Sequence, residues 1–524
     1  MRTGRARWKL LGAILALSLL AAACGGDDDA TGDDDDTAAA DIDPNGILRL
    51  GRDLTVPTAG QLDPISVDIV LDTLHEHLFG TMLHLNADGE VEPDLAESVV
   101  IDDPTHLTVT LRPGLKFTDG TVLDAEALKF SWERTIAQAR PGGIEAEFRE
   151  VKTLTVSSPT VLKVELKSPI AGAFYRLMRL GESSPVSPTA VKGGVDLNKT
   201  PVGAGPMKLA ELKLGESLKL VKNPDYWNAD AIKIAGITYT SVTPQSAVNA
   251  IKSNTVDYAQ VSTTTAREAA GTPGFKFTVE PTSGVMLQGL WCKSRPPFDN
   301  LKVRQALNYA IDKESLNIAV YDGKGESMDG FNSSDSPFYN KDLKGYYDHD
   351  ADKAKKLLAE AGVPNLAFDM FFQPGSEGQQ AAEVIQQQLD DIGVKVTLKP
   401  LSNAQDFYPN AQGAPINMLP LNRVGIPKVS RVLLSTSTGN ICGWNDPELN
   451  KLVLDLQGVS ENSTEGIALW KKISENGIRN AVHLFGLFGT RGVGVDETRL
   501  GGVEIYEARV GSPTLDLWKV YVKK

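Results

Sequence analysis

Residues 106–135 read HLTVTLRPGLKFTDGTVLDAEALKFSWERT, and this stretch decides the fold class. Its first seven residues alternate polar and apolar side chains, which is typical of a half-buried strand, and Pro113-Gly114 ends that strand in a turn. Asp124 stands where the N-cap of a helix is expected. The helix that follows would bury one side, made of Leu128, Ser131, Trp132 and Thr135. A strand, a turn and a helix in succession predict a mixed α/β or α+β domain.

Similar units recur in the second half of the chain. Residues 302–312 and 352–361 each place apolar side chains at helical spacing. A third helix over 381–392 ends at Gly393 and is followed by an alternating strand over 394–398. A helix, a glycine and a strand in this order are typical of an α/β lobe.

The composition is that of a globular protein with 524 residues, 41% of them hydrophobic and 23% charged. Such a length allows about three domains of roughly 100–200 residues each. The formal net charge of −14 leaves no basic surface to replace phosphate counterions, so we expect no nucleic acid partner. The sequence contains no P-loop, no nucleophile elbow and no S-x-x-K motif. We therefore expect a protein that is not an enzyme and that needs no cofactor.

One histidine cluster, His75 and His77 with His84 nearby, is a candidate metal site. Imidazoles are common ligands of Zn²⁺ and Ni²⁺. The apolar pattern around the first two histidines indicates a helix, which would point residues two positions apart in different directions. We therefore expect ordinary polar or capping histidines and no metal.

The N-terminus has the layout of an export signal. Residues 1–23 combine a basic start, an apolar run too short to span a membrane and a small-residue end, and Cys24 follows directly. This arrangement resembles a bacterial lipobox, in which the cysteine is acylated, although Ala21 replaces the usual leucine. An ordinary signal peptide followed by an unrelated cysteine is the alternative. Residues 24–45 are rich in Asp and predict a disordered linker rather than a Ca²⁺ loop, because the EF-hand spacing is absent.

Several motifs in the body resemble those of one family. The matching segments are, in order, PDLAES at 93–98, LRPGLKFTDG at 111–120, DAEAL at 124–128, PVGAGP at 201–206, NPDYW at 223–227, PFDN at 297–300 and GWNDPELNKL at 443–452. They are similar to motifs of the peptide/nickel class of extracellular solute-binding proteins, solute-binding family 5, which serve ABC importers. The resemblance covers nearly all of the chain from about residue 46.

The resemblance implies an α/β fold of two lobes, the type II (cluster C) periplasmic-binding-protein-like architecture, with an additional subdomain on lobe I. The expected ranges are 46–85, 201–288 and 485–524 for lobe I, 86–200 for its subdomain and 289–484 for lobe II. The chain would cross between the lobes at 288–293 and near Phe485. Such lobes close on a ligand by a hinge motion.

By the same resemblance, the protein would capture a small solute, peptide-like or of another class, and deliver it to the permease and ATPase subunits of an ABC importer. It would act as a monomer, held by the lipid on Cys24 at the extracytoplasmic face of a bacterial membrane, in a periplasm or a cell-wall space. The alternative is a sensory or chaperone-like lipoprotein of the same fold that presents its ligand to a membrane receptor.

The predicted ligand contacts come from a departure from the family pattern. The peptide-binding branch holds a peptide's α-ammonium with an Asp in a W-x-x-D-Y-x-D-P segment of lobe II. The corresponding residues here, 417–428, contain no acidic side chain and two cations, so ordinary free-amino peptides are expected to bind weakly. The resemblance places ligand-binding residues at Asn422, Arg423 and Gly425, with the Arg423 guanidinium facing a carboxylate, a phosphate or a ring. A solvent-facing or internally paired Arg423 is the alternative.

Further candidates lie near the expected crossing and at a strand end. They are Trp291, Phe371, Phe372 and Gln373, which would line an apolar or sugar-stacking cleft. Core packing is the alternative for the three aromatic residues. If Cys24 is lipidated, Cys292 and Cys442 remain, and in an oxidising compartment they form a disulfide or stay as two separate buried thiols.

Overall fold

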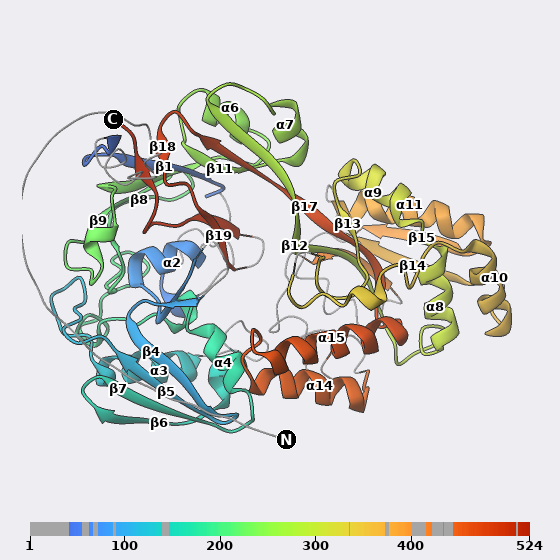
Figure 1. Cartoon of the computed structure of the whole chain (residues 1–524), viewed down its shortest axis with the longest axis horizontal. Helices are drawn as coiled ribbons and strands as arrows, with labels where there is room; N and C mark the ends of the chain where they lie inside the picture. Colours follow the sequence, from blue (N-terminus) through green and yellow to red (C-terminus); the bar gives the residue numbers. More distant parts are fainter. Residues whose placement is uncertain are drawn as a thin grey trace, which may run out of the picture. The chain divides into compact units, whose positions relative to one another are not determined.

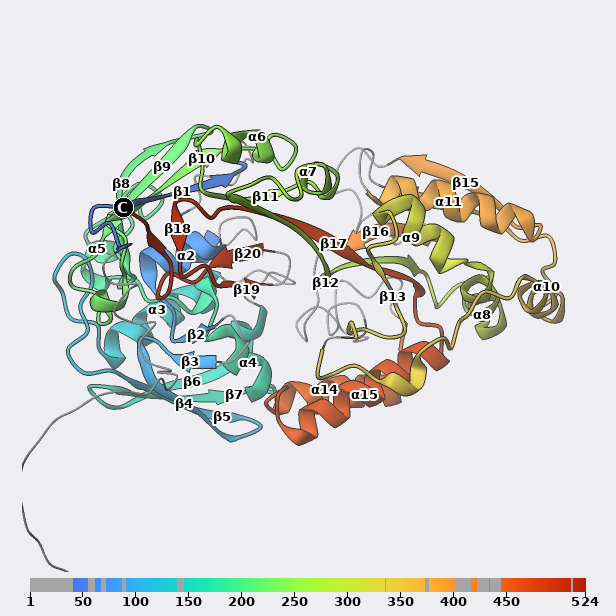
Figure 2. The ribbon, with the colours of Figure 1, turned by 45° about the horizontal axis from the view of Figure 1, so that its top comes forward.

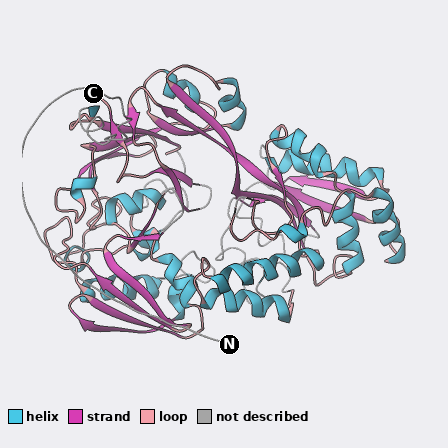
Figure 3. Ribbon diagram, viewed as in Figure 1, coloured by secondary structure: helices cyan, strands magenta, loops and turns pink. Residues whose placement is uncertain are grey.

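The computed structural model describes residues 41–54, 62–66, 72–86, 91–138, 146–334, 336–372, 377–400, 416–421, 433, 444–509 and 512–524. From Ile42 to Lys524 these residues belong to one unit in which helices and strands are mixed (Figures 1 and 3). The expected signal peptide and Cys24 lie outside the described residues. Among the residues that are described, no helix is both long and apolar enough to cross a membrane.

The stretch at 106–135 forms the predicted strand and helix. The strand is part of a four-stranded antiparallel sheet, in the spatial order β4 (Ala96–Asp103), β5 (His106–Leu111), β7 (Val161–Leu166) and β6 (Val151–Ser158). The helix α3 (Ala125–Gln138) begins after Asp124, whose Oδ1 accepts a hydrogen bond from the Ala127 amide at 2.9 Å. Trp132 of α3 is buried and packs edge-on against Phe174. Alternation and capping, both visible in the sequence, therefore produce this sheet and its helix.

An eleven-stranded mixed sheet organises most of the remaining chain. Its order is β15 (Lys395–Pro400), β14 (Ala367–Phe372), β16 (Ile416–Leu421), β12 (Phe275–Trp291), β17 (Leu484–Asp496), β11 (Tyr258–Val261), β1 (Ile47–Arg52), β10 (Gly236–Ser241), β9 (Ser217–Lys222) and β8 (Met207–Lys213), with β13 (Glu326–Ser327) also paired to β17. The long strands β12 and β17 are antiparallel neighbours and lie side by side in Figures 1 and 2.

Buried apolar side chains form two large cores. The first core draws its residues from 48–258 and 493–522, and the second core draws them from 286–488. Met286, Leu287 and Trp291 of β12 belong to the second core, whereas Val493 and Val495 of β17 belong to the first. The change from one large core to the other therefore takes place within β17, while Phe277 of β12 belongs to a third, smaller cluster. The exact lobe and subdomain ranges expected from the sequence stay a prediction.

The helices predicted for the second half are present, with shifted ends. They are α8 (Leu301–Ala310), α10 (Ala351–Glu360) and α11 (Glu377–Asp391), and α9 (Lys313–Tyr321) is an additional helix between them. Asp312 accepts hydrogen bonds from the Glu314 and Ser315 amides and thereby caps α9, so α8 ends at Ala310 and not at the expected Asp312. Figure 2 shows α11 lying along β15, onto which it packs.

Two paired helices near the C-terminal part contact a helix from the N-terminal half. α14 (Pro447–Gly458) is capped by Asp446, α15 (Thr464–Arg479) is capped by Ser463, and α4 (Ala171–Leu177) packs on α14. A Cβ atom at Gly172 of α4 would stand 1.9 Å from the Val459 carbonyl oxygen. The two backbones therefore approach as closely as glycine permits.

Short elements complete the described chain. They are α2 (Asp72–Phe79), β2 (Leu83–Leu85), β3 (Val91–Pro93), α5 (Pro188–Lys192), α6 (Ala247–Lys252), α7 (Thr263–Glu268), β18 (Leu500–Gly501), β19 (Ile505–Arg509), β20 (Ser512–Leu515), β21 (Tyr521–Val522) and the 3₁₀ turns Pro64–Ser66, Ala146–Glu150, Gly181–Ser183, Ala229–Ala231 and Lys341–Leu343.

Candidate ligand-binding site

The strands β12 and β17 contain the two segments at which the sequence predicts crossings. Gln288 pairs directly with Phe485, and Gly289 pairs with Leu484, in antiparallel register. Residues that stand opposite each other in such a pair point to the same face of the sheet. The Gln288 amide and the Phe485 ring therefore share a face at the place where the second core begins.

Three buried side chains near this pair have polar atoms without a protein partner. Gln288 and His483 are each 0% exposed, and Asn332 is 3% exposed. Both amide heteroatoms of Gln288, both ring nitrogens of His483 and the Nδ2 of Asn332 form no hydrogen bond to any residue in the described chain. Buried polar atoms in folded proteins are normally paired, so these atoms indicate a place where a water or a ligand group is needed.

Aromatic rings connect these polar groups. The ring of Phe331, the residue before Asn332, lies 5.8 Å from the His483 ring and 5.7 Å from the Phe485 ring, measured between centroids. The rings of His483 and Phe485 are 6.0 Å apart. We call Gln288, Phe331, Asn332, His483 and Phe485 the β12–β17 cluster. Its mixture of flat apolar faces and a few polar atoms is typical of small-molecule sites.

The charge next to the cluster is positive. Burial, together with the charge of Lys293, holds the pKa of His483 well below its usual value, so the imidazole is neutral. Burial, followed by the charge of Arg304, lowers the pKa of Lys293 to about 7. The Lys293 ammonium lies 4.9 Å from the centre of the Trp444 ring, in a cation–π contact. The surroundings of the cluster therefore favour a negatively charged group over a positive one.

Among the predicted aromatic residues, Trp291 occupies the packing position named as the alternative. Its Nε1 donates to the Val482 carbonyl at 3.0 Å, and its ring stacks on Phe298 with 5.8 Å between centroids. Phe372 is buried in the same second core, whereas Phe371 is half-buried. Trp291 and Phe372 thus stabilise the second core, and a contact of Phe371 with ligand stays a prediction.

Four other predicted ligand residues, Asn422, Arg423, Gly425 and Gln373, lie outside the described residues. The strand that leads into the first three is described. In β16, Leu419 pairs with Gln288 and Leu421 pairs with Met286. The described end of β16 therefore lies beside Met286, two residues before Gln288 in β12.

Cys292 takes part in a disulfide bond, and its partner lies outside the described residues. A free buried thiol at Cys292 is thereby excluded. The predicted pairing of Cys292 with Cys442 stays a prediction.

Sequence reasoning treated Gln288 only as part of a crossing and did not single out Asn332, His483 or Lys293. A signal for Gln288 was present, because it interrupts the apolar run VMLQGLW at 285–291 and a buried amide is costly without a partner. The other three have no such local signal. His483 comes near Gln288 through the pairing of β12 with β17, and Asn332 follows β13, which also pairs with β17.

The histidine cluster lies on α2 and β2, and its members have different neighbours. The Nδ1 of His77 is hydrogen-bonded with the Tyr239 hydroxyl at 2.9 Å, and burial with the charge of Arg52 lowers the pKa of His77 to about 3. His84 stacks on Trp518 at 4.3 Å. Within the described ranges, no group of three or more His, Cys, Asp and Glu residues is placed to hold a metal ion.

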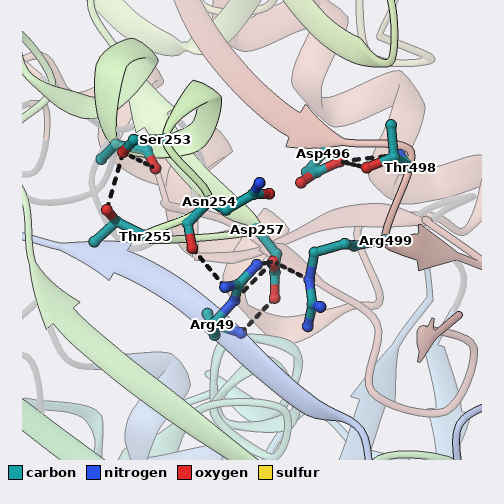
Figure 4. Close-up of polar contacts among 9 residues, drawn as sticks. Arg49, Ser253, Asn254, Thr255, Asp257, Asp496, Thr498 and Arg499 are labelled. Atoms are coloured by element: carbon teal, nitrogen blue, oxygen red, sulfur yellow. Dashed lines mark hydrogen bonds and ion pairs between the residues drawn. The ribbon is translucent and has the colours of Figure 1, made fainter. Parts of the chain in front are cut away.

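A second buried charged cluster has its carboxylate fully paired (Figure 4). Asp257 is enclosed by the protein, and its Oδ1 accepts hydrogen bonds from the Nε atoms of Arg49 and Arg499, each at 2.9 Å. Its Oδ2 accepts from the Arg49 amide at 2.9 Å. These bonds connect β1, the start of β11 and the chain after β17. This cluster is structural, in contrast to the unpaired atoms of the β12–β17 cluster.

Comparison with known proteins places the chain in a family. Residues 90–438 match the model of the bacterial extracellular solute-binding proteins, family 5 Middle. The glutathione-binding protein GsiB of Salmonella paratyphi A is 28% identical over 375 residues, which cover 70% of this chain and 71% of the relative. These relatives are binding proteins and not enzymes.

Solved structures show the same fold. The putative peptide-binding protein AppA from Clostridium difficile has a TM-score of 0.75 at 20% identity. The match covers 91% of this chain and 100% of AppA. The binding protein AgaA of A. tumefaciens R10, solved in complex with agropinic acid, has a TM-score of 0.70 at 24% identity, with 87% of this chain and 94% of AgaA covered. The expected type II periplasmic-binding-protein architecture is therefore confirmed, and the chain belongs to the bacterial extracellular solute-binding proteins of family 5.

Proposed function

We propose that the protein captures a small solute carrying at least one carboxylate and delivers it to the permease of an ABC importer. Family membership supplies the class, an extracytoplasmic solute-binding protein that works with permease and ATPase subunits. The lipid on Cys24 would hold the protein at the membrane. The preference for a carboxylate is the specific part of the proposal.

The observation that carries this preference is the set of unpaired polar atoms in the β12–β17 cluster. Gln288 Nε2 and Asn332 Nδ2 are buried donors without acceptors in the described chain, and the Lys293 ammonium is close to His483. A carboxylate brings acceptor oxygens and a negative charge, whereas an ammonium brings only donors and a second positive charge. The charge of Lys293 favours the first, whereas the unpaired Gln288 Oε1 and one ring nitrogen of His483 are acceptors that either a donor group of the solute or a water can satisfy.

The segment that leaves β16 supports the same preference. Residues 417–428 contain Arg423 and Lys428 and no acidic side chain, and they begin beside Gln288. The names of two similar proteins also refer to acids, since AgaA holds agropinic acid and glutathione carries two carboxylates beside its one α-ammonium. We therefore place the solute of this protein among small organic acids, including peptides without an accessible α-ammonium.

The first test is native mass spectrometry of the chain from residue 44, purified from cells grown in rich medium. A stoichiometric small molecule that is released on denaturation and carries a carboxylate is the expected result. A released ligand that is neutral or cationic would contradict the acid preference, while an empty protein would be screened by thermal shift with glutathione, dicarboxylates and a free-amino tripeptide library. Tight binding of free-amino tripeptides alone would show that the protein holds an α-ammonium with residues other than 417–428, contrary to the proposal.

Arg423→Ala provides a residue-level test of the same proposal. We expect the affinity for an acid ligand to fall at least tenfold, because a charge-assisted hydrogen bond contributes about 1.5–3 kcal/mol. Lys399→Ala, which removes an exposed cation from β15, is the matched control and should leave the affinity unchanged. Equal affinities of the Arg423 variant and the parent protein would remove Arg423 from the site.

A further inference from the structure

A small cavity lies between α4 and the connection of α14 with α15. Its volume is about 20 Å³. One side of its lining includes Arg176, which lies within α4, and Arg179, which follows α4. The other side includes Ser460, Glu461 and Asn462. A cavity of this size admits one water molecule or one monatomic ion. The close approach of Gly172 to Val459 closes the cavity beside the helix.

Arg176 is the unusual feature of this cavity. Its side chain is 5% exposed, and its Nε, Nη1 and Nη2 atoms form no hydrogen bond to any described residue. The Nε of Arg179 is likewise buried and unpaired within the described chain. A guanidinium has five N–H donors and no acceptor, so a buried one without partners is strongly destabilising. The cavity therefore needs an occupant that accepts hydrogen bonds.

Two carboxylates and one guanidinium act on the charge of Arg176. Glu461 is the strongest attractive neighbour, but its carboxylate also lies 3.5 Å from the Nη2 of Arg179. The repulsion of Arg176 by Arg179 exceeds the attraction by the more remote Glu147. Burial is the largest cause that lowers the pKa of Arg176, to about 10, so Arg176 remains protonated at neutral pH. The Glu461 carboxylate thus faces both guanidinium groups, and it forms no hydrogen bond with the Nε, Nη1 or Nη2 atoms of Arg176.

We propose that this cavity binds one monatomic anion, such as chloride, between Arg176 and Arg179. A halide accepts several N–H donors at once, which is what the unpaired nitrogens of Arg176 and Arg179 need. A water molecule would fit by volume, but it brings two hydrogens of its own and no charge. The size of the cavity and the surplus of donors together select the anion.

The anion site would affect how readily α4 and the segment after α14 come into contact. The link of this contact to solute binding rests on the proposed function. The walls of the site come from α4 and from the segment after α14, so it exists only while these two parts are in contact. An anion that binds only the contacted form stabilises that form. By thermodynamic reciprocity, if solute binding also favours the contacted form, chloride raises the affinity for the solute and the solute raises the affinity for chloride.

The test compares chloride with gluconate at equal ionic strength, because gluconate is too large for the cavity. The melting temperature of the solute-free protein should rise with chloride concentration and stay flat in gluconate. Arg176→Met should abolish the chloride response and should be at least as stable as the parent protein in gluconate, since it removes an unpaired buried charge. Arg479→Gln, at an exposed ion pair, is the matched control and should retain the response.

A second measurement locates the anion directly. Crystals grown in bromide should show one anomalous peak within contact distance of the Arg176 guanidinium, and this peak should be absent in Arg176→Met. Equal chloride and gluconate responses of the parent protein, or a bromide crystal with the contact formed and only water beside Arg176, would overturn the proposal. Neither readout depends on the identity of the solute, so a failure of the import proposal would leave this result unchanged.

Discussion

Asp257 and Lys293 are both buried charged residues, but they differ in their partners. Asp257 accepts hydrogen bonds from two arginine side chains, whereas the Lys293 ammonium faces the ring of Trp444 and the positive charge of Arg304. A paired buried charge stabilises the fold only while both partners are present, and a poorly compensated one loses its proton more readily. These two residues therefore lead to different experiments.

Asp257→Asn should be strongly destabilising. The substitution leaves Arg49 and Arg499 around a neutral amide, and breaking a buried pair of this kind costs about 3–5 kcal/mol of the free energy of unfolding. Urea denaturation followed by circular dichroism measures the loss. Asp225→Asn, at an exposed ion pair with Lys208, is the control, and its effect should stay below about 1 kcal/mol. Similar losses in both variants would contradict a structural role for Asp257.

Lys293 should make stability rise with pH above neutrality. Burial and Arg304 lower its pKa from 10.5 to about 7, so between these values the unfolded chain binds more protons than the folded one. The free energy of unfolding then increases as the pH rises from about 7 towards 10.5. Lys293→Met should flatten this part of the curve, while Lys472→Met, at an exposed position, should not. Parallel curves for the parent protein and Lys293→Met would contradict the lowered pKa.

At the scale of elements, the contact of α4 with the end of α14 depends on one glycine. Gly172→Ala would improve helix propensity, so any loss must come from the Val459 carbonyl oxygen at 1.9 Å from the new Cβ. We expect the contact to open, with a cost of about 1–3 kcal/mol for the forced separation. Small-angle scattering should show a larger radius of gyration.

Gly458→Ala, on the other side of the same contact, provides a graded comparison. Its Cβ would lie 3.1 Å from the Pro169 carbonyl oxygen, which a small shift accommodates. The effect on both the scattering profile and the free energy of unfolding should therefore be smaller than that of Gly172→Ala. The reverse order of the two variants would contradict the steric explanation.

Elements with local signals were predictable from the sequence, and contacts between distant segments were not. The sequence predicts α3 because Asp124 caps it. The sequence predicts α8 too long, because Asp312 continues the helical pattern although it is the N-cap of α9. The sequence alone does not decide whether Trp291 packs in a core or lines a cleft, because a tryptophan near a crossing fits both positions. His483 approaches the site through the pairing of β12 with β17, and Asn332 through the pairing of β13 with β17; the sequence carries no mark of either pairing at these two residues.

At the scale of the whole molecule, the proposed attachment to the membrane would rest on one atom, the Cys24 sulfur. Cys24→Ser should release the mature protein from the membrane fraction, because one substitution removes the only acylation site that the signal provides. Fractionation of cells followed by immunoblotting measures the distribution. Cys292→Ser is the control for the loss of a cysteine and should leave attachment unchanged. Membrane retention of the Cys24 variant would contradict lipid anchoring.

The pairing of Gly289 with Leu484 has a further consequence for the connectivity of the chain. The chain leaves β12 after Gly289 and enters β17 at Leu484, and these two residues pair with each other. The residues between them are therefore an insertion in the β12–β17 hairpin. A two-residue turn joining them would restore a continuous hairpin without stretching the backbone. Replacing residues 290–483 by such a turn would remove β13, β14, β15 and β16 from the sheet and leave β12 and β17 paired as its edge.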